Sequence, residues 1–204
     1  MTPARNPDLH GNAPDSASAV LLLIDVINDM EFEGGDRLLA QALPMAERLA
    51  AFKRRARAAG IPAVYANDNW GRWQSDFATL VRHCADEPVR GRPVVRTLLP
   101  DDDDYFVLKP KHSAFFATPL ETLLKYLGAR TLILTGIATD SCVLFTAADA
   151  FLRDFELIVP EDCVSAIEPD DHRQALRYMA RVMDVTVAAS GALDLAGLCR
   201  RRAA

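Results

Sequence analysis

AVLLLIDV, residues 19–26, is a short apolar run that an acid, Asp25, interrupts near its end. A strand whose two faces are both covered by helices reads as a continuous apolar run, whereas a strand with one solvated face alternates apolar and polar residues. The stretch therefore predicts a central strand of a parallel sheet.

Strand and helix patterns alternate along the rest of the chain. Short runs of β-forming residues predict strands at 61–67, 105–110, 131–137, 155–160 and 185–190. Helical spacing predicts helices at 44–59, with Pro44 in the first turn, and at 76–85, 119–127, about 141–152 and 170–183, and the segment from residue 192 is a candidate for a last helix. Six strands alternating with helices predict a three-layer α/β/α fold, in which helices cover both faces of a mostly parallel six-stranded sheet.

The length of 204 residues fits one domain. Residues 1–18 are rich in Pro, Asn, Asp and Ser, so we expect a flexible tail followed by a single domain over 19–204. The tail has no apolar signal region, and the four cysteines form no CxxC pair. Both features favour a reducing, cytoplasmic location with free thiols.

The charge balance argues against several classes of partner. The net charge is −5, and the basic cluster at 53–57 falls at the end of a predicted helix, where cations suit the helix dipole and water. We therefore expect no nucleic-acid binding. No eighteen apolar residues run uninterrupted, so we expect no membrane span.

Three polar residues follow the carboxyl ends of predicted strands, which is the edge where ligands bind in open α/β sheets. Asp25 closes the first strand, Lys109 the third, and Cys142 comes just after the fourth. Taken singly, these are a turn cap, a lysine that extends to solvent and a small core residue. Taken together, they suit nucleophilic catalysis by the thiol of Cys142. The helix N-terminus and the ammonium group of Lys109 would lower the thiol pKa from about 8.5 by about 1.5 units. Asp25 would take the thiol proton and pass it to the leaving group.

The turn between the fourth strand and its helix, residues 136–141, has two interpretations. Unpaired backbone N–H groups at the start of a helix can stabilise a developing oxyanion. The same turn also fits an ordinary strand-to-helix connection with Asp140 or Ser141 as N-cap.

The motifs LLLIDVIND, VLKPKHSAFFATPL and LTGIATDSCVLFTAADAF, with the later VPEDCVSA, resemble the isochorismatase-like cysteine hydrolase family over about 19–190. The resemblance implies an Asp25–Lys109–Cys142 triad, a thioester intermediate and hydrolysis of an amide-type C–N bond. It also implies a cis peptide before Ala138, whose N–H would join that of Cys142 in an oxyanion hole, and a homo-oligomer, a dimer or tetramer.

The stretch NDNWGRW, residues 67–73, bears on the type of family member. Nicotinamidases of this family hold a metal through an Asp-x-His pair and a further histidine, but here Trp70 occupies the place of the paired histidine beside Asp68. We therefore expect no metal, no other cofactor and a substrate other than nicotinamide, although His83 could still approach Asp68. True isochorismatases typically lack the cysteine, so Cys142 counts against cleavage of a vinyl ether.

The loops after the strand ends supply the expected pocket border. These residues carry apolar walls and a few polar groups, and the alternative for the aromatic ones is packing at the surface or between subunits. They are Trp70, Arg72, Trp73, His112, Phe115 and Phe116. We expect the acidic run 101–104 to be a solvated turn, and Cys84, Cys163 and Cys199 to be structural thiols.

The sequence leaves three hypotheses for function. The leading one is a cysteine hydrolase of a small amide, carbamoyl or imide compound. The others are an isochorismatase-type vinyl-ether hydrolase, with Cys142 incidental, and a non-catalytic member of the fold that binds a small molecule.

Overall fold

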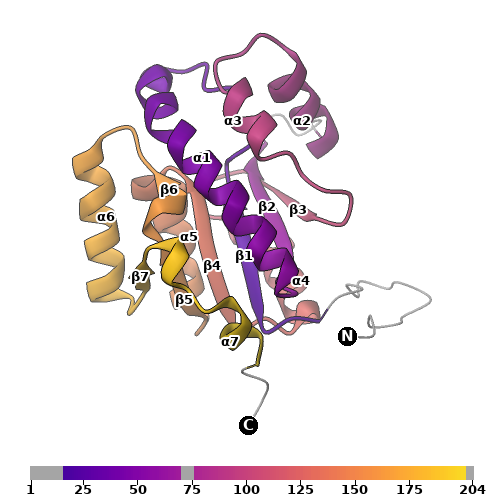
Figure 1. Ribbon diagram of the computed structural model, residues 1–204, viewed down its shortest axis with the longest axis vertical. Helices are drawn as coiled ribbons and strands as arrows, with labels where there is room; N and C mark the ends of the chain where they lie inside the picture. The colour runs from indigo at the N-terminus through magenta and orange to yellow at the C-terminus, as the bar shows by residue number, and fades with distance from the viewer. Residues whose placement is uncertain (1–15, 70–75, 201–204) are drawn as a thin grey trace.

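The computed structural model describes residues 16–69 and 76–200. Its strands form one parallel sheet in the order β3-β2-β1-β4-β5-β7, and β6 pairs with the end of β4 (Figure 1). The strands are β1 (Ala19–Ile24), β2 (Ala63–Asp68), β3 (Tyr105–Lys109), β4 (Thr131–Ile137), β5 (Glu156–Pro160), β6 (Val164–Ser165) and β7 (Thr186–Ala188). All six predicted strands are present, and β1 is central and buried throughout as predicted. The additional strand, β6, has only two residues, which is too few to leave a pattern in the sequence.

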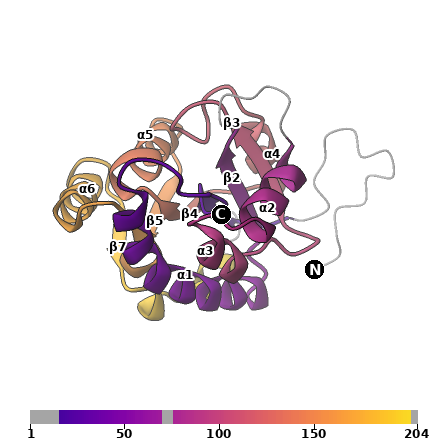
Figure 2. The same ribbon diagram turned by 90° about the horizontal axis from the view of Figure 1, so that it is seen from above.

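Helices cover both faces of the sheet, as predicted for a three-layer α/β/α fold (Figures 1 and 2). The helices are α1 (Gly35–Ala58), α2 (Phe77–Asp86), α3 (Arg92–Thr97), α4 (Leu120–Leu127), α5 (Leu144–Phe151), α6 (Pro169–Val182) and α7 (Leu195–Arg200). None of the helices in the described ranges is both long and apolar enough to cross a bilayer.

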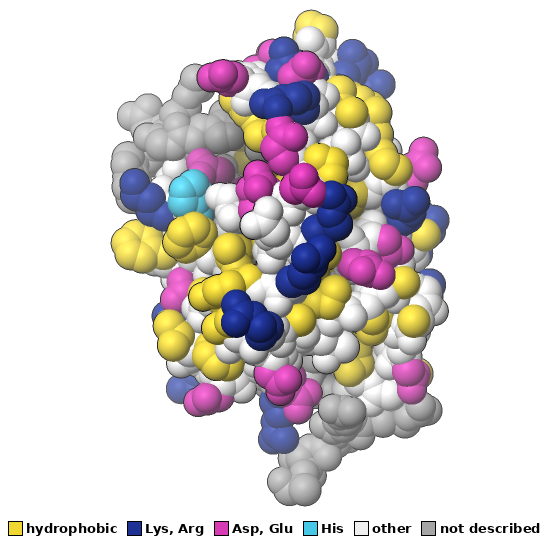
Figure 3. All heavy atoms as spheres, turned by 90° about the vertical axis from the view of Figure 1, so that its left-hand side faces the viewer, with side chains coloured by type: hydrophobic (Ala, Val, Ile, Leu, Met, Phe, Trp, Pro, Cys, Tyr) yellow, Lys and Arg dark blue, Asp and Glu magenta, His cyan; other side chains and the backbone are white. Residues whose placement is uncertain are grey.

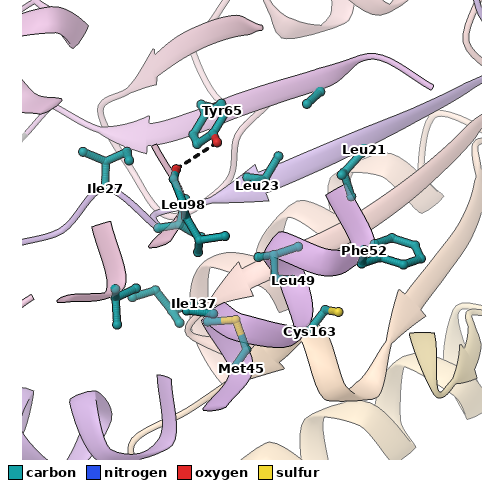
Figure 4. Close-up of a cluster of buried hydrophobic side chains, with 14 of the residues drawn as sticks. Leu21, Leu23, Ile27, Met45, Leu49, Phe52, Tyr65, Leu98, Ile137 and Cys163 are labelled. Carbon is teal, nitrogen blue, oxygen red and sulfur yellow. Dashed lines mark hydrogen bonds between the residues drawn. The ribbon is translucent and has the colours of Figure 1, made fainter. Parts of the chain in front are cut away.

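Side chains of β1 divide the interior into two cores, because successive residues of a strand point to opposite faces. Leu21 and Leu23 pack in the core that α1, α2 and α3 cover, part of which is drawn in Figure 4. Leu22 and Ile24 pack in the core under α4, α5 and α6. The buried cysteines Cys84 and Cys163 lie in the first core, and all four cysteines are free.

The predicted start of the first helix was wrong. Helix α1 begins at Gly35, so Pro44 lies in its interior instead of its first turn. The buried residues Leu38, Ala42, Met45 and Leu49 continue the helical spacing through the proline. Their burial against the sheet offsets the cost of the missing backbone donor.

The interpretation of the basic cluster and the acidic run was also incomplete. Lys53 lies on the buried side of α1, and its Nζ is 3.0 Å from both the Tyr65 hydroxyl and Asp101 Oδ2 and also pairs with Asp104. The Asp104 side chain is only 6% exposed, so the acidic turn is partly buried against Lys53. Burial alone would lower the pKa of Lys53, but Tyr65 and the two carboxylates outweigh it and raise the pKa.

The outer surface near α6 carries charges of both signs. Arg173, Arg177 and Arg181 follow one another at four-residue spacing and are exposed, and Arg173 pairs with Asp170. On the face shown in Figure 3, Lys and Arg side chains lie among Asp, Glu and apolar ones.

Candidate active site

The three strand-end residues meet at one edge of the sheet. Asp25 directly follows β1, Lys109 is the last residue of β3, and Cys142 lies in the turn after β4. The register brings these ends level, because Ile24 pairs with both Ala66 of β2 and Gly136 of β4, and Asp68 pairs with Lys109.

Asp25 and Lys109 form a buried ion pair. The distance from Lys109 Nζ to Asp25 Oδ2 is 2.7 Å, and Lys109 is fully buried. The backbone N–H of Asp68 donates to Asp25 Oδ1 at 2.7 Å, and Lys109 Nζ donates to the carbonyl of Lys111 at 3.2 Å. Burial raises the pKa of Asp25, while Lys109 acts in the opposite direction. Burial acts to lower the pKa of Lys109, but its negative neighbours, chiefly Asp25, together outweigh burial and raise this pKa.

The Cys142 thiol lies against this ion pair. Its Sγ is 3.5 Å from Lys109 Nζ, and the thiol also hydrogen-bonds to Asp25. Burial and the Asp25 carboxylate raise the pKa of Cys142 to about 12, and Lys109 opposes them. The expected lowering of this pKa was therefore wrong, because the sequence does not show how deeply the sulfur lies or how near the carboxylate is. The resting sulfur holds its proton and needs a base to release it.

The turn that carries Cys142 has an unusual backbone. The Ile137–Ala138 peptide bond is cis, as the resemblance implied, and Thr139–Val143 forms one π-helical turn before α5. The carbonyl of Ala138 accepts from the N–H groups of Ser141 and Val143 at 3.1 Å each. The predicted N-cap was wrong, because no side chain caps this turn.

A hydrogen bond from α6 also holds the turn that carries Cys142. Thr139 is fully buried, and its Oγ1 is 2.9 Å from Nδ1 of His172. Burial lowers the pKa of His172. Sequence reasoning missed this contact, because a polar residue on an exposed-looking helix gives no signal of a partner far along the chain.

A cavity of about 630 Å³ opens in front of the thiol. The wall includes the catalytic candidates Asp25 and Cys142, further residues of the turn after β4 and four residues of the loop after β1. Apolar side chains of Phe32, Leu38 and Ile167 form part of it, and Asn28, Asp29, Glu31, Asp68, His112, Ile137, Ala138, Asp140 and Ser141 complete the set. The loop after β1 could have been found, since it leaves the same sheet edge as Asp25. Phe32 and Ile167 give no such signal.

The predicted pocket border is only partly placed in the cavity. His112 lines the cavity. Phe115 instead packs in the second core, 6.0 Å from the ring of Phe155, and Phe116 is 56% exposed and lies outside the lining. Both expectations are corrected, because the second core takes up the ring of Phe115 and the ring of Phe116 is exposed to solvent. Trp70, Arg72 and Trp73 lie outside the described residues.

The residues considered for a metal have other partners. His83 contacts Asp29 at 3.4 Å and Glu87 at 3.0 Å, and Asp68 Oδ2 lies 3.9 Å from Lys109 Nζ. Within 16–69 and 76–200, no three His, Cys, Asp or Glu side chains form a group that could hold a metal ion.

Another cavity, of about 660 Å³, lies at the amino end of β5. Its wall includes Phe151, Glu156, Met183 and Leu198, and none of Asp25, Lys109 and Cys142. It therefore lies away from the reactive groups, and the smaller cavity is the candidate active site.

The comparisons with known proteins agree with this geometry. Residues 19–190 match the model of the isochorismatase domain. The chain is 39% identical over 167 residues to the isochorismatase family protein YaaI of Bacillus subtilis (strain 168), a match that covers 82% of this chain and 91% of that protein. It is 32% identical over 190 residues to the ureidoacrylate amidohydrolase RutB of Methylobacterium radiotolerans, with coverage of 80% and 74%. The crystal structure of N-carbamoylsarcosine amidase from Thermoplasma acidophilum superposes with a TM-score of 0.66 at 28% identity, covering 87% of this chain and 99% of that one.

Proposed function

The chain belongs to the isochorismatase family and is a hydrolase, and we propose that it hydrolyses a small amide, carbamoyl or imide C–N bond through a thioester on Cys142. One observation carries the proposal: the Cys142 thiol touches both members of the buried Asp25–Lys109 pair at the floor of a cavity. Two similar proteins, the amidohydrolase and the amidase named above, act on amide-type bonds by their names.

Asp25 is the base of the first half-reaction. As Sγ of Cys142 bonds to the substrate carbonyl carbon, the thiol proton passes to Asp25, and from there to the nitrogen that leaves as the C–N bond breaks. Lys109 supports this transfer because its charge favours the ionised form of Asp25, against the effect of burial. The products of this half are a free amine or ammonia and a thioester on Cys142.

The backbone N–H groups of Ala138 and Cys142 are the proposed donors to the oxyanion. Both residues line the cavity, and both belong to the turn between β4 and α5. A pair of fixed donors contributes about 3 kcal/mol or more to such a step. Water then attacks the thioester, the S–C bond breaks, and the thiol is restored with release of the acid.

Vinyl-ether hydrolysis, as in true isochorismatases, remains the alternative activity. It needs no nucleophile, so it gives no reason for a thiol in contact with both Asp25 and Lys109. Retained cleavage of isochorismate by Cys142→Ser would favour this alternative over the proposed one. A homo-oligomer also stays a prediction, which light scattering on the purified chain would test.

A screen of amides, ureas and cyclic imides tests the proposal. We expect ammonia or amine release with at least one compound, and a mass increase on the peptide that contains Cys142 when the reaction is quenched with acid. Cys142→Ala should abolish both signals, and Cys84→Ala, which removes a buried thiol that does not line the cavity, should abolish neither. A panel that yields no adduct and no released nitrogen, or activity that survives Cys142→Ala, would overturn the proposal.

A further inference from the structure

His112 is a second titratable group in contact with the sulfur of Cys142. It lies in the loop after β3, and its Nδ1 is 3.7 Å from Cys142 Sγ and 3.5 Å from Ser141 Oγ. The ring packs on Phe145 of α5, with 5.5 Å between the ring centroids. The imidazole is thus held in place beside the reacting atom, and the proposed first half-reaction does not use it.

The two bases lie in different surroundings. Asp25 is 5% exposed, and its two carboxylate oxygens are occupied by Lys109 and by the N–H of Asp68. His112 is exposed and lines the open cavity. Water that hydrolyses a thioester must arrive from the cavity, where the imidazole is exposed and the carboxylate is largely covered.

A neutral imidazole is an effective general base near neutral pH. Its distance to the sulfur also suits the reverse transfer, because a base that has taken a proton from water must return it to the departing thiolate. The 3.7 Å from Nδ1 to Sγ is already within hydrogen-bonding distance for a sulfur atom. Lys109 adds a positive charge next to the same thiolate, at 3.5 Å.

We propose that His112 is the general base that activates water to hydrolyse the acyl group on Cys142, an inference that rests on the proposed thioester chemistry. The water oxygen bonds to the acyl carbon while its proton passes to the imidazole. The S–C bond then breaks, and the imidazolium gives that proton to the Cys142 thiolate. The step consumes one water, forms the acid and returns both His112 and Cys142 to their starting states.

Acetylation by p-nitrophenyl acetate tests this step without knowledge of the natural substrate. Nitrophenolate release reports formation of acetyl-Cys142, and peptide mass spectrometry after acid quenching reports its decay. In His112→Gln, we expect the decay to slow by about 100-fold, the lower end of the usual general-base contribution, and the first burst of nitrophenolate to change far less. His112→Phe keeps a ring on Phe145 but has no base, so it should behave as His112→Gln does.

Two controls separate the base from a structural role. His83→Gln makes the same substitution at a ring bonded to Asp29 and Glu87, and its acetyl-enzyme should decay at the wild-type rate. Hydroxylamine attacks a thioester without a base, so it should remove the acetyl group from His112→Gln and wild type equally fast. Melting temperatures of all the variants confirm that they fold.

Several outcomes would overturn the inference. Decay at the wild-type rate in His112→Gln shows that the imidazole is not the base. An equal slowing of the nitrophenolate burst, or loss of the hydroxylamine reaction, shows that the ring orients the thiol or holds the cavity open instead. If the acetyl-enzyme behaves as expected but no amide is ever hydrolysed, the proposed function fails while the role of His112 stands.

Discussion

Asp25→Asn should make the Cys142 thiol more acidic and the enzyme less active. The carboxylate raises the pKa of Cys142, which burial and Asp25 together bring to about 12. Asparagine has nearly the same shape and can still accept the N–H of Asp68, so the site keeps its geometry. The substitution removes the repulsion of the thiolate and, at the same time, the proposed proton acceptor.

The size of the effect follows from the contact between Lys109 and Cys142. At 3.5 Å and an effective dielectric constant of about 20, an ammonium attracts a thiolate by about 5 kcal/mol. Asp25 offsets this attraction in the wild type. With the carboxylate gone, the full value would lower the thiol pKa by about 3.5 units, and after relaxation of the side chains we expect at least about one unit.

Alkylation by iodoacetamide measures this shift. The rate of modification of the Cys142 peptide, followed from pH 6 to 11, should begin to rise at a lower pH in Asp25→Asn than in the wild type. The kcat for an amide should fall by about 100-fold or more. An unchanged or higher thiol pKa would refute the electrostatic argument. Turnover at the wild-type rate would refute the role of Asp25 as base.

Three further predictions concern stability and the turn. Lys53→Met should lower the free energy of unfolding, measured by urea denaturation, by about 3–5 kcal/mol, because it leaves the Asp104 carboxylate buried without its cation. Adding Asp104→Leu to this variant should recover part of the loss. Burial lowers the pKa of His172 below its usual 6.5, so the unfolded chain binds a proton more readily than the folded one. The free energy of unfolding should therefore fall as the pH drops through about 6.5. His172→Gln should flatten this dependence in thermal melts from pH 5 to 8. Gly136 has a φ of 105°, and a Cβ there would overlap the Ile24 carbonyl, so Gly136→Ala should lower the free energy of unfolding by more than about 2 kcal/mol. Gly191→Ala, where a Cβ meets open space, should lower it much less in the same melts.

The fold was predictable where a segment is long enough to show a pattern. The run from Ala19 to Ile24 is buried on both faces, so its composition alone indicates a central parallel strand. β6 consists of Val164 and Ser165 and pairs with the end of β4, which only the three-dimensional structure reveals. The start of α1 was missed because proline favours the first turn on average, whereas here the burial of neighbouring residues decides.

The candidate site was predictable in its members but not in its electrostatics. Asp25, Lys109 and Cys142 could be grouped because carboxyl ends of parallel strands share one edge. The protonation of the thiol depends on its burial and on its distances to the opposite charges of Asp25 and Lys109, and the sequence predicts neither. The same limit applies to Lys53, whose position in a basic run suggested a solvated cation although its side chain is 8% exposed.

A protonated resting thiol has a consequence for the proposed reaction. A group with a pKa of about 12 is almost entirely neutral at pH 7, so small electrophiles and peroxides meet a poor nucleophile. A bound carbonyl changes this, because the proton can move to Asp25 while the S–C bond forms and the oxyanion gains its backbone donors. Lys109 serves both states: it favours the ionised form of Asp25 before the attack and adds its charge to any thiolate that forms later. The reactivity of the Cys142 thiol would then depend on the substrate being present. At pH 7, hydrogen peroxide should therefore oxidise Cys142 more slowly in the wild type than in Asp25→Asn.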